Sequence, residues 1–414
     1  MTQIFEYAYD KDKWERFYED YASNDHSYAA DIKHLRNYIE SGKYLEVLEN
    51  YEQSGNFPVP RLIILNKKGT EKKRTVFSFD EDESWLLKFF GFHLHVYDEI
   101  FSDNLYSFRK QRSVKTAVAK IMKQKRLTEM YGVKLDIHDY FNSADTGLIL
   151  RKLKAVLYDQ EKLYVLFEKI LKNPYVYIDE KTDEDTEQEG NTEQDKVIST
   201  VHKGMMAGSP LSPFLANLYL KDIDSHFEDP DVFYARYSDD IIIFTDSKER
   251  LECELDFFMR ALEENGLTLN PEKMNYIDPG SSFEFLGFLF DRGTIDVSAA
   301  SFEKIKKKLR RKSRAILRWR IKKNIDTEKA ARVYIRYFNR KFFENPIKSE
   351  LTWCRWYFPV ITTDKTLKEI DHYMQECIRF LYTGKHSKRN YNLRYESIKK
   401  LGYRSLVNEF HKNS

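Results

Sequence analysis

Residues 233–244 read FYARYSDDIIIF, two runs of β-forming side chains around a short polar turn. The aromatic and β-branched flanks favour strands, and the spacing leaves room only for a tight turn, so the stretch predicts an antiparallel hairpin. The turn carries two adjacent carboxylates, Asp239 and Asp240. Alone they indicate little, because an aspartate in a turn often bonds only its own backbone.

A second candidate acid follows another apolar run, in YGVKLDIHDYF at residues 131–141. Val133 to Leu135 predict a strand, and Asp136 stands at its end. Two neighbouring strand ends that each present a carboxylate can hold a pair of Mg²⁺ ions, the arrangement that transfers phosphoryl or nucleotidyl groups. The two stretches together therefore predict a two-metal site.

The chain has 414 residues, enough for two or three sub-domains, and its 42% hydrophobic content indicates a folded protein. Its 68 basic and 66 acidic residues nearly cancel but are unevenly distributed. Three widely separated cysteines in no metal-ligand spacing indicate a reducing compartment. There is no signal-like start and no apolar run of about 18 residues, so we expect a cytoplasmic protein without a membrane span.

The first quarter of the chain predicts helices followed by a hairpin. Residues 1–60 have helical spacing and end in a proline-rich stop, which predicts a helical extension. Runs at 61–65 and 75–79 then flank a basic turn and predict a second hairpin. Its cations either keep a sheet edge soluble or fold over a triphosphate, and both interpretations stay open. They are Lys67, Lys68, Lys72, Lys73 and Arg74.

The middle of the chain alternates helices with charged segments. Residues 85–125 are helical in pattern, with a break near 102–104. Arg109 and Arg112 precede an amphipathic helix, where they either grip a phosphate backbone or cap the helix. Residues 145–171 predict another helix. Residues 179–195 hold nine acids against one lysine, which predicts a mobile loop between two strands.

Two glycine-containing turns follow. A glycine- and proline-rich loop at 204–213 leads into a predicted helix at 214–227 and suits close approach to a base or sugar, although such loops are common. Residues 249–265 predict a helix. SFEFLGFLF at 282–290 predicts a third hairpin, with Gly287 in its turn.

Residues 301–341 are strongly basic, with 17 Lys or Arg against three acids. Apolar residues fall near helical spacing, which leaves a polybasic face on the same helix. Charge runs are often only solvated faces, but a nearly single-sign run favours contact with a phosphate backbone. Further helices are predicted over the last seventy residues.

In this order, the pieces resemble the reverse transcriptases over roughly residues 58–300, and among them the bacterial enzymes related to group II introns, retrons and abortive infection. RLIILNKKGTEKKRTVF at 61–77 resembles the fingers hairpin, and LYSFRKQRSVKTAV at 105–118 resembles the segment N-SYGFRPGRS-A. YGVKLDIHDYF resembles the first palm motif and YSDD the YADD box. NPEK at 270–273 and FEFLGF at 283–288 resemble the lysine motif and the hairpin that grips the primer end.

The resemblance implies a role for each matching residue. Asp136 and Asp239 would bind the metal ions, with the Ile137 carbonyl as a further ligand and Asp240 as the third catalytic acid. A bulky Phe141 beneath the sugar would exclude a 2′-hydroxyl and so select dNTPs. The implied dNTP contacts are Lys67, Arg74, Ile137, Phe141, Ala207 and Lys273. The implied nucleic-acid contacts are Arg109, Arg112, Gly208, Gly287, Lys307, Arg311 and Arg314.

One departure from the family pattern is informative. The family loop commonly reads PQG-x-x-SP, whereas MAGSPLSP at 206–213 has Ala207 in place of glutamine. That glutamine packs near the sugar and the templating pair, so its loss puts ordinary processive copying in doubt. The change is similar to the defence-associated branch, which synthesises DNA in antiphage immunity, often from a dedicated noncoding RNA.

We therefore predict an α+β right-hand polymerase. Its parts are a helical extension at 1–60, fingers at 61–132, an antiparallel-sheet palm at 133–300 and a basic helical thumb at 301–414. It would be an RNA-directed DNA polymerase with two Mg²⁺ ions, dNTPs, a noncoding RNA template and a cDNA product. Alternatives are a retron-type enzyme, an RNA-dependent RNA polymerase, template-independent or protein-primed DNA synthesis, and an inactive RNA-binding scaffold. Template, primer, trigger and oligomeric state stay open.

Overall fold

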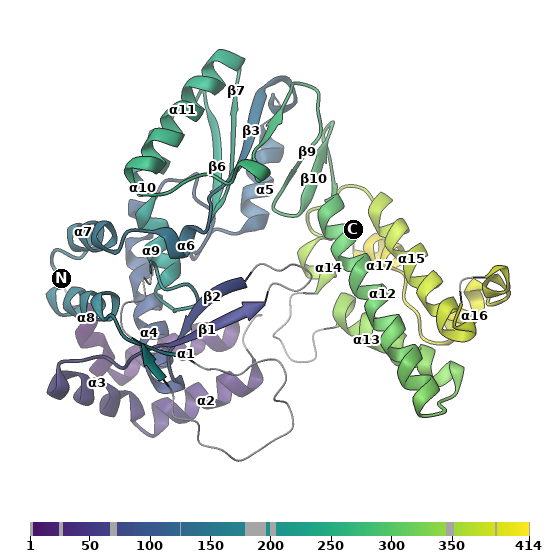
Figure 1. The fold of residues 1–414 in the computed structure, drawn as a ribbon, viewed down its shortest axis with the longest axis horizontal. Helices are drawn as coiled ribbons and strands as arrows, with labels where there is room; N and C mark the ends of the chain where they lie inside the picture. The colour runs from purple at the N-terminus through teal and green to yellow at the C-terminus, as the bar shows by residue number, and fades with distance from the viewer. Residues whose placement is uncertain are drawn as a thin grey trace. The chain divides into compact units, whose positions relative to one another are not determined.

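The chain folds into two compact units, which we describe separately (Figure 1). The computed structural model describes residues 3–24, 28–66, 73–124, 126–178, 196–198, 204–344, 352–385 and 387–413. The first unit comprises Met1–Ser23, Ala30–Ala117 and Met130–Tyr276, and the second comprises the rest. The last crossing between the units lies between Tyr276 and Ile277, so the hairpin around Gly287 belongs to the second unit. The predicted division into fingers, palm and thumb stays a prediction.

The amino-terminal part of the first unit is helical, as predicted. Its elements are η1 (Ile4–Tyr9), α1 (Lys11–Ser23), α2 (Ala29–Glu40) and α3 (Lys43–Ser54). They pack through aromatic side chains on α4 (Glu81–His93), where the rings of Trp14 and Phe89 stack with centroids 4.1 Å apart. Both rings are fully buried, so this extension shares the core of the unit.

A small sheet follows the helices, in the order β2-β1-β4-β5. The predicted hairpin is confirmed as β1 (Arg61–Asn66) paired antiparallel with β2 (Lys73–Ser78). β4 (Val176–Ile178) runs parallel to β1, and β5 (Lys196–Ile198) pairs antiparallel with β4. The acidic segment 179–195 connects β4 to β5 and lies outside the described residues, as do Lys67, Lys68 and Lys72.

Two of the predicted helices are each divided in the structure. The one expected at 145–171 forms α7 (Thr146–Val156) and α8 (Glu161–Lys172), and between them buried Gln160 accepts a hydrogen bond from Ile4 N (2.6 Å). The one expected at 214–227 forms α9 (Ser212–Tyr219) and α10 (Lys221–His226), with a break at Leu220. The first unit also contains η2 (Leu94–Ile100) and α6 (Tyr140–Ser143). α5 (Val114–Lys123) begins in the first unit and ends in the second, which also contains η3 (Leu127–Glu129).

The central sheet has the order β6-β7-β3-β8. The opening stretch of the sequence analysis forms the predicted hairpin, β6 (Phe233–Tyr237) and β7 (Asp240–Thr245), and β3 (Tyr131–Asp136) pairs antiparallel with β7. On one face Val133, Leu135, Ile241 and Ile243 are fully buried, and α11 (Lys248–Glu264) packs on β7 and β3 (Figure 1). Beyond α11, η4 (Pro271–Lys273) leads into β8 (Asn275–Ile277).

The second unit combines a three-stranded meander with a helical bundle. Its strands are β9 (Phe283–Phe285), β10 (Phe288–Asp291) and β11 (Thr294–Val297), and the predicted hairpin is confirmed. α12 (Ala299–Lys322), α13 (Thr327–Phe343) and α15 (Lys365–Thr383) form the bundle. The remaining helices are α14 (Trp353–Trp356), η5 (Lys388–Asn392), α16 (Tyr395–Lys400) and α17 (Leu406–Asn413). No helix within the described ranges is long and apolar enough to cross a bilayer.

The packing of the central sheet requires a glycine at position 132. A Cβ atom there would lie 2.4 Å from two ring carbons of Phe244, its partner on β7. We expect Gly132→Ala to lower the free energy of unfolding by about 1–3 kcal/mol, the usual cost of overpacking a core. Urea unfolding followed by circular dichroism measures this. Adding Phe244→Leu should recover part of the loss, and a wild-type midpoint for Gly132→Ala would contradict the packing.

Candidate active site

The central sheet brings the three predicted acids together at one end. Asp136 is the last residue of β3 and pairs directly with Asp240, the first residue of β7. Asp239 lies in the turn before β7, and its carbonyl accepts a hydrogen bond from Ile137 N (3.3 Å). Strand register therefore places two carboxylates opposite each other, with the third beside them.

Like charges opposite each other destabilise a sheet, so this end needs compensating cations. Burial raises the pKa of Asp240, the charges of Asp239 and Asp136 raise it further, and Lys134 opposes them. The Lys273 ammonium lies 2.6 and 2.7 Å from the two carboxylate oxygens of Asp136. The local chemistry is thus that of a crowded anionic site partly neutralised by lysines.

These donors fit divalent magnesium. Mg²⁺ is a hard ion that takes oxygen ligands and is usually held by one or two carboxylates together with substrate phosphates. Within the described residues, no group of three or more His, Cys, Asp or Glu side chains is placed to hold a metal ion. A site of this kind would therefore draw its remaining ligands from the triphosphate, with Asp136, Asp239 and the Ile137 carbonyl as the protein's contribution.

Lys273 reaches Asp136 because the chain returns alongside β3. Ile137 bridges to Leu269, and Asn270 N donates to the carbonyl of Asp136 (2.8 Å). The turn η4 then directs Lys273 back to the carboxylate. Between α11 and η4, the chain therefore meets the end of β3 through this isolated bridge.

Phe141 lies five residues after Asp136, and its ring is half-buried against Phe108 at 6.5 Å between centroids and 80° between planes. Its carbonyl accepts a hydrogen bond from Met205 N (2.7 Å). A Cβ on Gly204 would lie 2.2 Å from that carbonyl oxygen, and Gly204 has φ +52°. Only glycine therefore fits where the loop meets the segment that carries Phe141.

The same loop also contacts the β1–β2 hairpin. Ala207 is buried, and its carbonyl accepts a hydrogen bond from Phe77 N on β2 (2.7 Å). Gly208, at φ +92°, is exposed, and a Cβ there would lie 3.0 Å from the carbonyl of Phe77. Arg74 is an exposed residue of β2. The structure thus places Ala207 and Gly208 beside the strand that carries Arg74.

Arg109 and Arg112 contact the protein itself. The Arg109 guanidinium donates to the carbonyls of Ser102 (2.7 Å) and Asp98 (2.8 Å), and Arg112 pairs with Asp103. Burial lowers the pKa of Arg109. These contacts favour the capping alternative of the sequence analysis over phosphate binding, because the cations hold the loop before α5 in place.

The sequence profile of the family described as "Reverse transcriptase (RNA-dependent DNA polymerase)" matches residues 65–290, more than half of the chain and the whole of the site above. The chain belongs to the reverse transcriptase family. The predicted relationship to retron enzymes and the predicted α+β polymerase fold are confirmed.

Among curated proteins, the chain is similar to the retron Ec86 reverse transcriptase of Escherichia coli, with 24% identity over 106 residues. The match covers 25% of this chain and spans only 33% of the retron enzyme. Among solved structures, it is similar to apo telomerase from Candida tropicalis truncated from the C-terminal domain (12% identity, TM-score 0.42, 61% of this chain and 59% of that one). Telomerase from Candida tropicalis in complex with a TWJ fragment of telomeric RNA gives 12% identity and TM-score 0.45, over 87% and 67% of the two chains.

In the second unit, Gly287 occupies the β9–β10 turn, where it and Leu286 both have positive φ. A Cβ on Gly287 would lie 3.2 Å from Ser301 Oγ, so the turn packs closely on the start of α12. Its carbonyl accepts a hydrogen bond from Ser298 N (3.0 Å). These contacts account for the glycine structurally, and its role toward nucleic acid stays a prediction.

The polybasic face predicted for α12 has a clear geometry. Lys307, Arg311 and Arg314 are exposed and follow one another at four and three residues, which aligns them on one face opposite buried Ile305 and Leu309. No described carboxylate lies within ion-pair distance of these three side chains. They are therefore available for an external anion.

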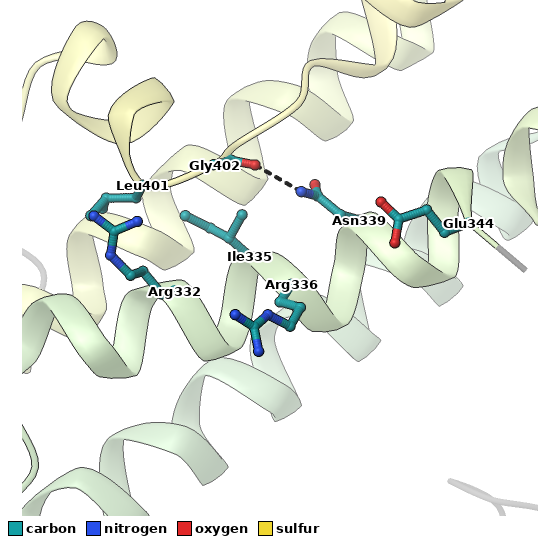
Figure 2. Close-up of a pocket in the computed structure, with 7 residues that line it drawn as sticks. All are labelled: Arg332, Ile335, Arg336, Asn339, Glu344, Leu401 and Gly402. Atoms are coloured by element: carbon teal, nitrogen blue, oxygen red, sulfur yellow. Dashed lines mark hydrogen bonds between the residues drawn. The ribbon is translucent and has the colours of Figure 1, made fainter. Parts of the chain in front are cut away.

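The arginines of α13 are arranged differently. Arg332 pairs with Glu328 (2.6 Å), one turn earlier on the helix. Figure 2 shows the pocket of about 210 Å³ that Arg332 and Arg336 line, where Asn339 Nδ2 donates to the carbonyl of Gly402 (2.7 Å). Glu344 at the other end pairs with Arg404 (3.3 Å). Carboxylates in and near this pocket pair with arginines, so α12 is the better candidate for binding nucleic acid.

Replacing the three α12 cations tests that face. We expect Lys307→Glu/Arg311→Glu/Arg314→Glu to weaken RNA binding and to reduce the slope of log K against log salt by about 2, since each phosphate contact contributes roughly 0.7. Fluorescence anisotropy with labelled RNA between low and moderate salt measures both. The control, Lys365→Glu/Lys399→Glu/Lys400→Glu, makes the same charge change at exposed positions of the same unit. Equal effects from both triple variants would contradict a specific face.

Four buried residues that support the site were not identified from the sequence. They are Ser107, Asn217, Asp224 and Arg236, and they hold the turn that carries Asp239. The only sequence signal was the arginine inside the apolar run of β6, since a charge in a buried strand needs a partner.

Proposed function

We propose that the chain is an RNA-directed DNA polymerase that joins dNTPs by two-metal nucleotidyl transfer. The observation that carries the proposal is the direct pairing of Asp136 with Asp240 across β3 and β7, with Asp239 in the adjoining turn, inside the region matched by the family. Carboxylates held this way on a rigid sheet provide the ligands that phosphoryl-transfer sites require.

The site's own residues divide the work between them. Asp136, Asp239 and the Ile137 carbonyl would hold a pair of Mg²⁺ ions, and Asp240 would add negative charge beside them. The chemistry that such ions would supply is activation of the primer 3′-hydroxyl and stabilisation of the pyrophosphate leaving group. Arg74, with Lys67 of the same hairpin, neutralises the triphosphate.

The remaining contacts concern the sugar and the leaving group. Phe141, braced by Phe108, excludes a 2′-hydroxyl and so selects dNTPs. Lys273 is close enough to Asp136 to balance its charge, and it can donate a proton to pyrophosphate once the triphosphate is bound.

The template we propose is a dedicated noncoding RNA, copied into cDNA in antiphage defence. Two observations support this: Ala207 stands where the family commonly has glutamine, and the chain is similar to a retron reverse transcriptase. The second likeness also favours a retron-type enzyme as an alternative. Sequencing the RNA and DNA that copurify with the protein separates the two, because a branched RNA–DNA product would support the retron type.

The metal ligands give the sharpest test of the proposed chemistry. We expect Asp239→Ala and Asp136→Ala each to lower dNTP incorporation roughly 1000-fold, since a lost ligand removes several kcal/mol of transition-state stabilisation. RNA binding should stay near wild type, because neither change removes a cation. The control Asp246→Ala removes an exposed acid beyond the other end of β7. A wild-type rate for either site variant would show that the ligands are assigned wrongly.

The sugar gate is tested separately. We expect Phe141→Ala to reduce the preference for dNTPs over rNTPs by roughly 10–100-fold, in the range of steric discrimination in enzyme pockets. Phe141→Tyr keeps the ring and should keep the preference. Single-nucleotide incorporation with dATP and ATP gives the ratio of kcat/KM for each variant. Unchanged discrimination in Phe141→Ala would remove Phe141 from this role.

A further inference from the structure

The peptide that leads into Asp239 is held from both sides by buried side chains. Ser238 N donates to Ser107 Oγ (2.9 Å), and Arg236 Nη1 donates to the carbonyl of Ser238 (3.3 Å). Ser238 has φ +62°, a region that residues other than glycine seldom adopt. Both polar backbone groups of a strained residue are therefore fixed immediately before the acid.

The two clamping side chains are themselves anchored. Asn217 Nδ2 on α9 donates to the carbonyl of Ser107 (2.9 Å), and Ser107 Oγ donates to Asn217 Oδ1 (3.3 Å). Arg236 Nε donates to Asp224 Oδ1 (2.7 Å) on α10, and its Nη2 donates to the other carboxylate oxygen. The Tyr234 hydroxyl also donates a hydrogen bond to Asp224 Oδ1 (2.8 Å). All five residues are buried.

The Arg236 guanidinium keeps its charge although it is fully buried. Burial alone would lower the pKa of Arg236, but the adjacent Asp224 carboxylate outweighs burial and holds the pKa above its ordinary value. A buried pair of this kind adds little stability compared with apolar side chains, and it is better understood as fixing one geometry. Here the fixed group is the Ser238 carbonyl, which belongs to the Ser238–Asp239 peptide.

We propose that Ser107 and Arg236 are positioning residues that hold the Asp239 carboxylate in its metal-binding orientation, with Asn217 and Asp224 as their supports. The proposal rests on the proposed function, because it assigns Asp239 a metal ion. Neither residue contacts a reacting atom; each acts through the Ser238 backbone. Groups that orient a metal ligand affect metal affinity almost as strongly as the ligand itself.

The test compares two buried hydroxyl deletions. Ser107→Ala removes the acceptor for Ser238 N, whereas Thr245→Val removes a bond from Thr245 Oγ1 to the carbonyl of Ser247 (2.8 Å) at the far end of β7. Mn²⁺ affinity of the full chain is measured by isothermal titration calorimetry, and kcat and KM by single-nucleotide incorporation. We expect Ser107→Ala to lose roughly 10–100-fold in Mn²⁺ affinity and in kcat, with KM for dNTP little changed, and Thr245→Val to lose neither.

Equal Mn²⁺ affinity for the two variants would overturn the proposal. If Ser107→Ala does not fold, Ser107→Cys serves in its place, because it keeps the side-chain size but is a weak hydrogen-bond acceptor. A wild-type protein that binds Mn²⁺ but incorporates no dNTP would defeat the proposed polymerase function, while the Mn²⁺ affinities would still decide whether the clamp positions Asp239. Arg236→Lys keeps the charge beside Asp224 without the Nη1 donor, and it should also lower Mn²⁺ affinity.

Discussion

Two carboxylates, Asp136 and Asp240, face each other across β3 and β7, and the first unit is built to keep them there. Their repulsion would be relieved if the strands separated, so the pairing has to be supported from the other side of the sheet. The residues that alternate with the acids, among them Val133, Leu135 and Ile241, are fully buried beneath α11 and its neighbours. Apolar burial thus offsets the electrostatic cost of concentrating negative charge at this end of the sheet.

The elements with local signals were predictable, and those that depend on distant contacts were not. The hairpins and the acidic turn could be predicted from β-forming runs and from the turn residues between them, because these signals lie in neighbouring residues. The segment between α7 and α8 is held by Gln160, which bonds to Ile4, 156 positions away. Ser107 and Asn217 are likewise separated by 110 positions, so no local pattern could connect them.

The candidate site shows the same limit for charged residues. Asp136, Asp239 and Asp240 could be predicted as site residues because a strand end and a turn each show an acid within a short stretch of sequence. Whether an arginine faces solvent or a neighbouring carbonyl depends on how its loop folds, and Arg109 turned out to hold Ser102 and Asp98. For Arg332 on α13, the internal ion pair could be predicted from the sequence, because Glu328 lies one helical turn before it.

The loop that contains Ala207 joins two parts of the first unit through backbone hydrogen bonds. Phe77 on β2 donates to the Ala207 carbonyl (2.7 Å), and two residues earlier Met205 donates to the Phe141 carbonyl (2.7 Å). Under the proposed function, the hairpin that would hold the triphosphate and the segment that would contact the sugar are therefore connected through this one loop. A displacement of the hairpin would then reach the backbone that carries Phe141, so a change in phosphate binding would also alter which sugar is accepted.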